Sequence, residues 1–194
     1  MIKRSKAIIL CGFGAVVLLT AIDLWSKRWA EENLAEKRRG ESPPLCIADK
    51  SGYILTQRVR TQSLVLVEDF LEFRYAENCG AAFGMLHNAP VIFRSVLFST
   101  AASLAIVALF WMFITGSGGP LFAYSVPLVT AGAIGNLVDR VNNGYVVDFI
   151  RFHIRDLFEW PTFNFADMTI TVGVVLLLLD GLRRPAAKVE KNPA

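Results

Sequence analysis

Charged residues are scarce in this sequence and are almost absent from long stretches of it. Only 19% of the 194 residues are charged and 54% are hydrophobic, whereas soluble domains average about 25% and about 45–50%. Four windows of nearly 20 residues (7–25, 95–114, 119–138 and 161–179) contain no charged side chain except Asp23 and Asp167. Because a bilayer core needs about 20 apolar residues per helix, the sequence predicts four membrane spans. It excludes a soluble enzyme, a disordered chain and a collagen-like chain.

Cysteine and histidine are scarce as well. The three Cys and two His residues lack HExxH or CxxC spacing, so no metal site and no cofactor are expected. Cys11 is interpreted as a small core residue of the first span. Cys46 and Cys79 both fall on the side opposite the chain ends, where the surroundings can be oxidising, and the sequence leaves open whether they pair. The net charge of +3 is small and scattered, which argues against nucleic acid as a partner.

Basic residues at the two ends of the chain indicate its orientation. An even number of spans puts both termini on one side, and positive flanks favour the cytoplasmic side: Lys3, Arg4 and Lys6 before the first span, and Arg183, Arg184, Lys188 and Lys191 after the last. The N-terminus also has the pattern of a cleaved signal peptide, but no small-x-small site closes the apolar run. Bulky Leu10 stands before Cys11 where a lipoprotein cleavage box needs a small residue. We therefore predict a retained first span.

The spans and the segment between the first two define the predicted architecture. We expect one domain over residues 1–194, with spans at about 7–25, 93–114, 119–138 and 163–181 and an outer-face segment at 26–90. Within that segment we predict a short amphipathic helix at 26–36, a loop at 37–49, and strands at 53–59 and 64–75. The predicted fold class is membrane α-helical, with four transmembrane helices, a small extracytoplasmic β-sheet cradle and a short amphipathic helix.

Strongly polar side chains gather at the outer ends of these spans. At 1.5 Å per residue, the expected directions of the spans bring eight of them to one level: Asp23, Asn78, Asn136, Asp139, Arg140, Asp148, Asn164 and Asp167. Ionisable groups are costly in a membrane, so this convergence indicates a functional site. For the adjacent pair Asp139 and Arg140, a purely structural role at a helix end is an equally good interpretation. Simple solvation explains Asp148 and Asp167 poorly, because both have apolar neighbours in sequence.

Two carboxyl groups facing each other in a partly desolvated site cannot both ionise cheaply. One pKa rises, and one group then acts as general base on a water while the other, protonated, polarises a carbonyl. This is the chemistry of aspartic proteases, which needs neither a metal nor a nucleophilic side chain. A Ser–His scheme would have to use His87 or His153, and no GxSxG-like turn is present.

Five sequence runs, in this order along the chain, resemble the bacterial lipoprotein signal peptidase (signal peptidase II) family: DLWSK at 23–27, NCGAAFG at 78–84, GAIGNLVDR at 132–140, GYVVDFI at 144–150 and FNFAD at 163–167. The resemblance covers about residues 7–32 and 63–182. It implies an intramembrane aspartic endopeptidase of the inner membrane, with its active site near the periplasmic face. The substrate would be a diacylglyceryl-modified prolipoprotein, cut on the N-terminal side of the lipidated cysteine.

The resemblance also implies roles for single residues and partners. By motif match the catalytic aspartates are Asp148 and Asp167. The implied substrate-binding or supporting residues are Asp23, Lys27, Asn78, Gly80, Gly132, Asn136, Asp139, Arg140 and Asn164. Membrane lipids are expected partners, and cyclic peptide antibiotics such as globomycin are expected inhibitors.

Some questions stay open at the level of sequence. The segment between Asp23 and Asn78 is longer than the resemblance leads us to expect, and the excess, about residues 36–62, has no recognisable motif. It would extend the cradle, restrict the substrate entrance, or be a tolerated surface loop. A proton-coupled transporter using the same carboxylates is a second functional hypothesis, although the polar groups lie at one membrane face and not at the midplane. A non-enzymatic assembly factor is a third, and it gives no reason to bury two aspartates.

Overall fold

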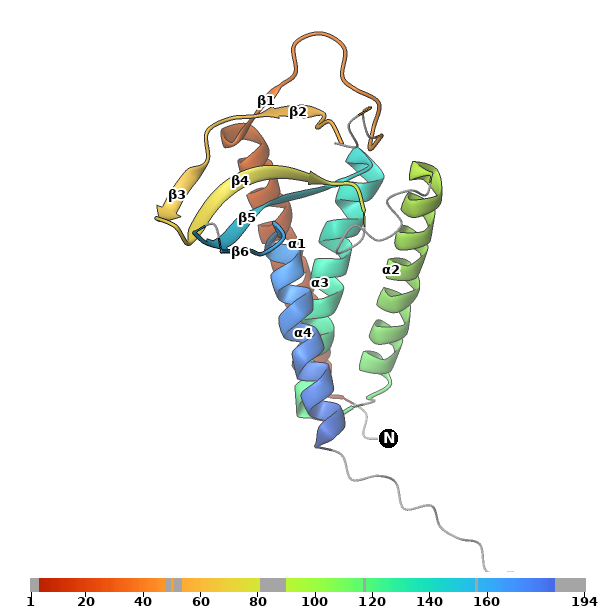
Figure 1. Ribbon diagram of the computed structural model, residues 1–194. Helices are drawn as coiled ribbons and strands as arrows, with labels where there is room; N and C mark the ends of the chain where they lie inside the picture. Colours follow the sequence, from red (N-terminus) through yellow and green to blue (C-terminus); the bar gives the residue numbers. More distant parts are fainter. Residues whose placement is uncertain are drawn as a thin grey trace, which may run out of the picture.

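The computed structural model describes residues 4–47, 50, 54–80, 90–116, 118–155 and 157–183, which form four long helices and six short strands. The helices stand side by side as a bundle, and the strands lie across one end of it. The N-terminus lies at the opposite end (Figure 1). All the strands are therefore at the end of the bundle where the sequence places the polar side chains.

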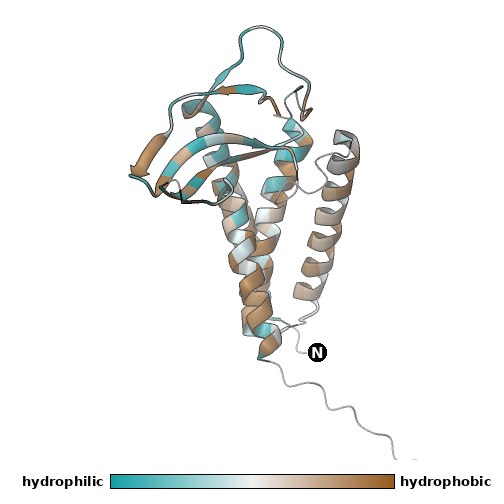
Figure 2. Ribbon diagram, in the orientation of Figure 1, coloured by the Kyte–Doolittle hydropathy of each residue, from teal (hydrophilic) through white to brown (hydrophobic). Residues whose placement is uncertain are grey.

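The four helices are α1 (Lys6–Asn33), α2 (Val91–Ile114), α3 (Pro120–Asn143) and α4 (Phe165–Leu182). Each is long and apolar enough to cross a membrane. Figure 2 shows hydrophobic residues along much of the length of the helix ribbons. Large side chains on these helices are exposed, among them Leu10, Val107 and Leu178, and give the bundle an apolar surface. Such a surface is unfavourable in water and suited to lipid. The predicted membrane α-helical class is thus confirmed.

The first helix differs in detail from the sequence prediction. The expected span and the expected amphipathic helix at 26–36 form one continuous helix that ends at Asn33. No Gly or Pro interrupts residues 15–33, and the polar residues after Trp25 include good helix formers, so nothing in the sequence ends the helix at the membrane surface. The chain then enters strand β1 (Ala35–Lys37), which pairs with β2 (Arg58–Arg60) in an antiparallel two-stranded sheet.

A four-stranded antiparallel sheet lies at the same end of the bundle. Its order is β3 (Leu64–Val67), β4 (Leu71–Asn78), β5 (Val146–Ile154) and β6 (Phe158–Glu159). The strand predicted at 64–75 is in fact the β3–β4 hairpin, because Asp69 takes a left-handed conformation with φ of 58° and turns the chain. The strand predicted at 53–59 appears as the shorter β2; residue 53 lies outside the described part of the chain.

A small apolar core joins the sheet to the C-terminal end of α1. Ala30 of α1, Tyr75 of β4 and Val147 of β5 are all buried in it. The ring of Trp29 packs edge-to-face against Phe73, with 5.7 Å between ring centroids. Edge-to-face aromatic pairs add to the stabilisation from buried area. This packing fixes β4 and β5, which carry some of the polar site residues, relative to α1, which carries others.

The opposite end of the bundle fixes α4 against α3. Both carboxyl oxygens of buried Asp180 in α4 accept backbone N–H bonds from the start of α3, from Gly119 (2.9 Å) and Phe122 (3.2 Å). Midway along the helices, a Cβ on Gly173 would lie 2.6 Å from Val129 Cγ2, so the glycine lets the two helices come close. These contacts fix α4 along α3, and they thereby fix where the first turn of α4 lies relative to the sheet.

Candidate functional site

Asp148 lies on β5 and is only 2% exposed. The strand places it opposite Ala76 of β4. Its carboxyl oxygens accept two side-chain hydrogen bonds, from Asn164 Nδ2 to Oδ1 (2.7 Å) and from Asn78 Nδ2 to Oδ2 (3.0 Å). A buried carboxyl needs such partners, and both come from segments that the sheet and α4 bring together.

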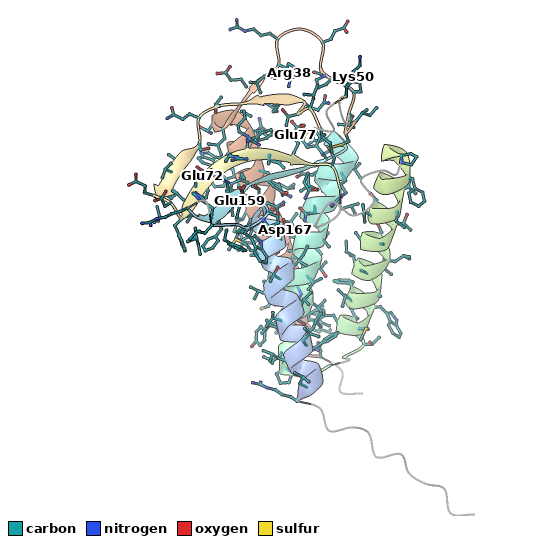
Figure 3. All side chains as sticks on the ribbon, in the orientation of Figure 1. Arg38, Lys50, Glu72, Glu77, Glu159 and Asp167 are labelled. Carbon is teal, nitrogen blue, oxygen red and sulfur yellow. A yellow bond between two sulfur atoms is a disulfide. The ribbon has the colours of Figure 1, made fainter. Side chains whose placement is uncertain are left out.

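Asp167 lies in the first turn of α4, at the sheet end of the bundle (Figure 3). It forms a capping box with Asn164: the Asn164 side chain accepts from the Asp167 backbone N–H, and the Asp167 carboxylate accepts from the Asn164 backbone N–H. Asn136 Nδ2 of α3 donates to Asp167 Oδ1 at 2.8 Å. The side chain is half-buried.

Two asparagine side chains link the two carboxyl groups. Asn164 Nδ2 lies within hydrogen-bond distance of Asp148 Oδ1 and of Asn136 Oδ1 (3.2 Å). Asn136 in turn donates to Asp167. An amide oxygen that accepts and an amide nitrogen that donates fix which way each asparagine points. Asp148 and Asp167 are therefore held as a pair through one continuous hydrogen-bonded chain.

A buried lysine organises the other charged groups. Lys27 Nζ, on α1, lies 2.8 Å from Asp23 Oδ2, 3.2 Å from Asp139 Oδ2 and 2.9 Å from Asn136 Oδ1. Lys27 and Asp23 are only 2% and 1% exposed. The ammonium thus has an oxygen partner for each of its three hydrogens. We call Asp23, Lys27 and Asp139 the Lys27 cluster.

The Lys27 cluster is connected to both aspartates of the pair through the backbone. Asp139 Oδ2 accepts from the Val147 N–H (3.0 Å), next to Asp148, and Asp23 Oδ1 accepts from the Ala166 N–H (2.8 Å), next to Asp167. The two carboxylates therefore fasten the segments on which the pair is built. Asp139 has this defined structural partner and is not simply solvated at a helix end.

The remaining residues implied by the resemblance lie at the margin of this network. A Cβ on Gly132 would lie 2.4 Å from the Ala166 carbonyl oxygen, so this glycine permits close approach of α3 and α4. The Gly80 N–H donates to Asn78 Oδ1 at 3.1 Å, which orients that side chain. Arg140 donates to the Asn136 carbonyl oxygen and lies over the Phe98 ring, 5.8 Å from its centroid. In the described part of the chain, no group of three His, Cys, Asp or Glu side chains is placed to hold a metal ion.

Burial of the Asp148 carboxyl and the neighbouring negative charge of Asp167 raise the pKa of Asp148 to about 7, opposed in part by the hydrogen bonds from Asn78 and Asn164. The ordinary value is 3.8. Between these two pH values the folded protein holds a proton that the unfolded chain has released. Wild-type stability must therefore fall as the pH rises through this window.

This linkage predicts how Asp148→Asn changes stability with pH. The amide has no proton to lose, so the difference in Tm between the variant and the wild type should grow in favour of the variant from pH 4.5 to pH 7.5. Thermal unfolding in detergent micelles at several pH values measures it. Asp69→Asn, on the exposed hairpin turn, is the matched control and should give the same Tm difference throughout. A flat Asp148→Asn difference would contradict the raised pKa.

Three features of the strands, the β1–β2 loop and the bundle were not predicted from the sequence or were left undecided by it. Cys46 and Cys79, left open above, form a disulfide. Glu77 accepts backbone N–H bonds from Gln57 and Arg58, which no motif signals. Asp180 accepts backbone N–H bonds at the start of α3, which no motif signals either. Each depends on contacts between distant segments. Of the residues involved, only Cys79 belongs to a recognised sequence run, NCG at 78–80.

Four apolar helices with a small antiparallel sheet at one end define a polytopic membrane protein. The backbone is similar to solved structures described as bacterial membrane enzymes. One has a TM-score of 0.69 and 26% identity, covering 100% of this chain and 99% of that one; another has a TM-score of 0.70 and 25% identity, covering 95% and 99%.

Sequence comparison identifies the family. Residues 15–183 match the signal peptidase (SPase) II family. Relatives named lipoprotein signal peptidase include those of Oleidesulfovibrio alaskensis (33% identical, 84% of this chain and 88% of the relative), Clostridium tetani (37%, 61% and 73%) and Cupriavidus pinatubonensis (43%, 61% and 66%). The chain belongs to the signal peptidase II family, which confirms the resemblance found in the sequence runs.

Proposed function

We propose that this protein is an intramembrane aspartic endopeptidase that removes the signal peptide from diacylglyceryl-modified prolipoproteins, cleaving on the N-terminal side of the lipidated cysteine. The observation that carries the proposal is the pair Asp148 and Asp167, linked through two asparagine amides at the sheet end of four apolar helices. Family membership supports the substrate class, and the paired carboxyls support the aspartic mechanism.

The different settings of the two carboxyls suggest different roles. Asp148 is the more buried and holds a proton up to about pH 7. Asp167 sits at the N-terminus of α4 and is the more exposed of the two carboxyls, so it is the one that a water can reach. Asp167 is therefore the general base, and Asp148 is the general acid.

The proposed reaction proceeds in two steps. Asp167 takes a proton from a water, whose oxygen adds to the scissile carbonyl carbon, while Asp148 gives its proton to the carbonyl oxygen. In the resulting tetrahedral diol, Asp167 donates the acquired proton to the leaving amine of the lipidated cysteine and the C–N bond breaks. Asp148 regains its proton from the diol hydroxyl as the new carboxyl group forms. Both aspartates then return to their starting protonation states.

The surrounding residues act in positioning. Asn78, Asn136 and Asn164 orient the two carboxyls through their amide hydrogen bonds. Asp23, Lys27 and Asp139 hold the backbone segments that carry the pair. Gly132 permits the close approach of α3 and α4, and the Gly80 N–H orients the Asn78 side chain. Arg140 contributes a positive charge close enough to interact with both aspartates.

The membrane setting is part of the proposal. By the positive-inside rule both termini are cytoplasmic, so the pair lies near the periplasmic face of the inner membrane. Apolar outward surfaces of the helices suit both the signal peptide's hydrophobic stretch and the two acyl chains. A cyclic peptide antibiotic such as globomycin is expected to inhibit by occupying the aspartate pair as an uncleavable substrate.

Cleavage of a matched pair of substrates tests the proposal. Protein reconstituted in phosphatidylethanolamine and phosphatidylglycerol vesicles is given one prolipoprotein peptide with an S-diacylglyceryl cysteine and one with a free cysteine. We expect cleavage before the cysteine, identified by mass spectrometry, with the unlipidated peptide slower by about 100-fold or more because it lacks the acyl chains' burial energy.

Two outcomes would contradict parts of the proposal. Equal cleavage of both peptides would remove the requirement for lipid while keeping the peptidase. No cleavage of either, together with a proton or solute flux across the same vesicles, would favour a transporter.

A further inference from the structure

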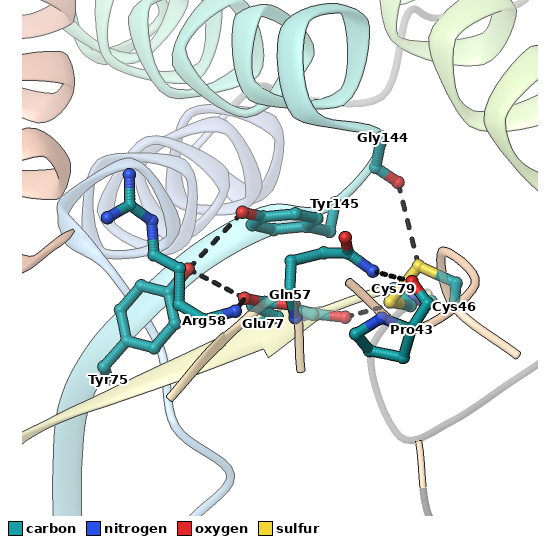
Figure 4. The surroundings of a disulfide bond; sticks show 11 residues. Pro43, Cys46, Gln57, Arg58, Tyr75, Glu77, Cys79, Gly144 and Tyr145 are labelled. Atoms are coloured by element: carbon teal, nitrogen blue, oxygen red, sulfur yellow. Dashed lines mark hydrogen bonds between the residues drawn. A yellow bond between two sulfur atoms is a disulfide. The ribbon is translucent and has the colours of Figure 1, made fainter. Parts of the chain in front are cut away.

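A disulfide lies directly beside one of the residues that hold Asp148. Cys46, in the loop between β1 and β2 (residues 38–57), is bonded to Cys79 (Figure 4). Cys79 immediately follows Asn78, which ends β4 and donates to Asp148 Oδ2 at 3.0 Å. The β1–β2 loop is thus covalently attached one residue away from a hydrogen-bond donor of the aspartate pair.

The same loop also contacts the start of the strand that carries Asp148. Gly144 ends α3 with φ of 78°, and β5 begins two residues later. A Cβ on Gly144 would lie 2.3 Å from Leu45 Cδ2, and Cys46 Sγ lies 3.9 Å from the Gly144 carbonyl oxygen. Leu45 and Cys46 therefore touch the α3–β5 junction while the disulfide secures the end of β4.

A third set of contacts anchors the far end of the loop to β4. The Glu77 carboxylate accepts the backbone N–H groups of Gln57 (2.6 Å) and Arg58 (2.9 Å), and Gln57 Nε2 donates to the Pro43 carbonyl oxygen at 2.8 Å (Figure 4). Glu77 pairs in register with Val147, next to Asp148. With these bonds the described loop residues Pro43, Leu45, Cys46 and Gln57 are held to one another, to β4 and to the α3–β5 junction.

We propose that the Cys46–Cys79 disulfide positions Asn78 against Asp148, so that full peptidase activity requires the oxidised cysteine pair. The inference rests on the proposed aspartic mechanism. Asn78 is the last residue of its strand, and strand ends lose their pairing most easily. The crosslink to a loop packed on the start of β5 keeps the ends of β4 and β5 together, and with them the amide and the carboxyl.

Release of the crosslink has two expected kinetic consequences. Asp148 becomes negatively charged as it gives its proton to the carbonyl oxygen, and a hydrogen bond to a charged group contributes more than one to a neutral group. Partial loss of the Asn78 bond should therefore lower kcat by about 10-fold. The Asn78 bond also lowers the pKa of Asp148. Its loss raises that pKa, so the alkaline limb of the kcat profile, where Asp148 gives up its proton, should move to higher pH. KM should change little, because Asn78 acts on the carboxyl.

The experiment compares oxidised and reduced protein with the lipidated substrate, whose thioether is inert to reductant. The wild type is reduced with tris(2-carboxyethyl)phosphine and then reoxidised with oxidised glutathione. On reduction we expect kcat to fall about 10-fold and the alkaline limb of the kcat profile to move to higher pH. Both changes should reverse on reoxidation. Cys46→Ser/Cys79→Ser should show the lowered kcat without reductant. Cys11→Ser, which changes the free and exposed cysteine, should behave as wild type.

Asn78→Ala separates positioning from a general structural effect. In this variant reduction should cause no further loss of kcat and no further movement of the limb, because the disulfide would act through the missing amide. An equal additional loss would overturn the proposal, and so would reduced wild type with unchanged kcat and pH profile.

Gln57→Ala provides a test that leaves the disulfide intact, in case reduction unfolds the protein. It removes the bond to Pro43 and should lower kcat in the same direction with the same displacement of the limb; an unchanged kcat would count against the proposal. Failure of the proposed function itself looks different, because oxidised wild type would then not cleave the substrate at all.

Discussion

Asp148→Asn and Asp167→Asn should each lower kcat for a lipidated prolipoprotein peptide by about 10³-fold or more. Each substitution keeps the volume and most hydrogen-bonding atoms of the side chain and removes the titrating group. General acid–base catalysis contributes about 10²–10⁴-fold, and here one group must take the water's proton while the other supplies a proton to the carbonyl oxygen. Single-turnover cleavage measured by mass spectrometry gives kcat separately from KM.

The two losses should not multiply. Because both aspartates act in the same steps, the double variant is expected to be little worse than either single one. Asp69→Asn, which changes an exposed aspartate on the β3–β4 turn, is the matched control and should retain wild-type kcat. Wild-type activity in a folded Asp148→Asn or Asp167→Asn variant would refute the aspartic mechanism.

Lys27→Met should have the largest effect on stability. It leaves the buried carboxyls of Asp23 and Asp139 without their cation, and removal of one partner of a buried ion pair costs about 3–5 kcal/mol. At about 2–4 °C per kcal/mol for a chain of this size, Tm should fall by roughly 10 °C. Activity should fall as well, because both carboxyls fasten backbone next to the aspartate pair. Thermal unfolding in micelles and kcat at low temperature measure the two effects.

Two comparisons isolate the cause. Arg28→Met changes the neighbouring basic residue, whose salt bridge with Glu32 is exposed, and should leave Tm unchanged. Lys27→Met combined with Asp139→Asn leaves one fewer uncompensated carboxyl and should be more stable than Lys27→Met alone. A Tm loss as large in Arg28→Met as in Lys27→Met would show that the Lys27 cluster is not the source of the effect.

The membrane class and the level of the site could be predicted from sequence because they depend on local composition. A charge-free run long enough to cross a bilayer is costly to expose to water, whatever it packs against. Asp23 and Asp167 stood out against that background, and Asp148 stood out by its apolar neighbours in sequence. The hairpin within 64–78 was missed because its turn depends on the left-handed conformation of Asp69, which alternation of side chains does not signal.

The sequence by itself determined the four spans, the gathering of polar residues at one end of them and the resemblance to the family, since each is carried by residues near one another in the chain. Only the tertiary structure decided how these residues are connected. Hydrogen bonds and ion pairs act over about 3 Å, so the contacts of Lys27 with Asp139, of Asn164 with Asp148 and of Cys46 with Cys79 exist only where folding brings distant segments together. Leu45, Cys46 and Gln57, which lie in a stretch without a recognisable motif, thereby become part of the structure around Asp148.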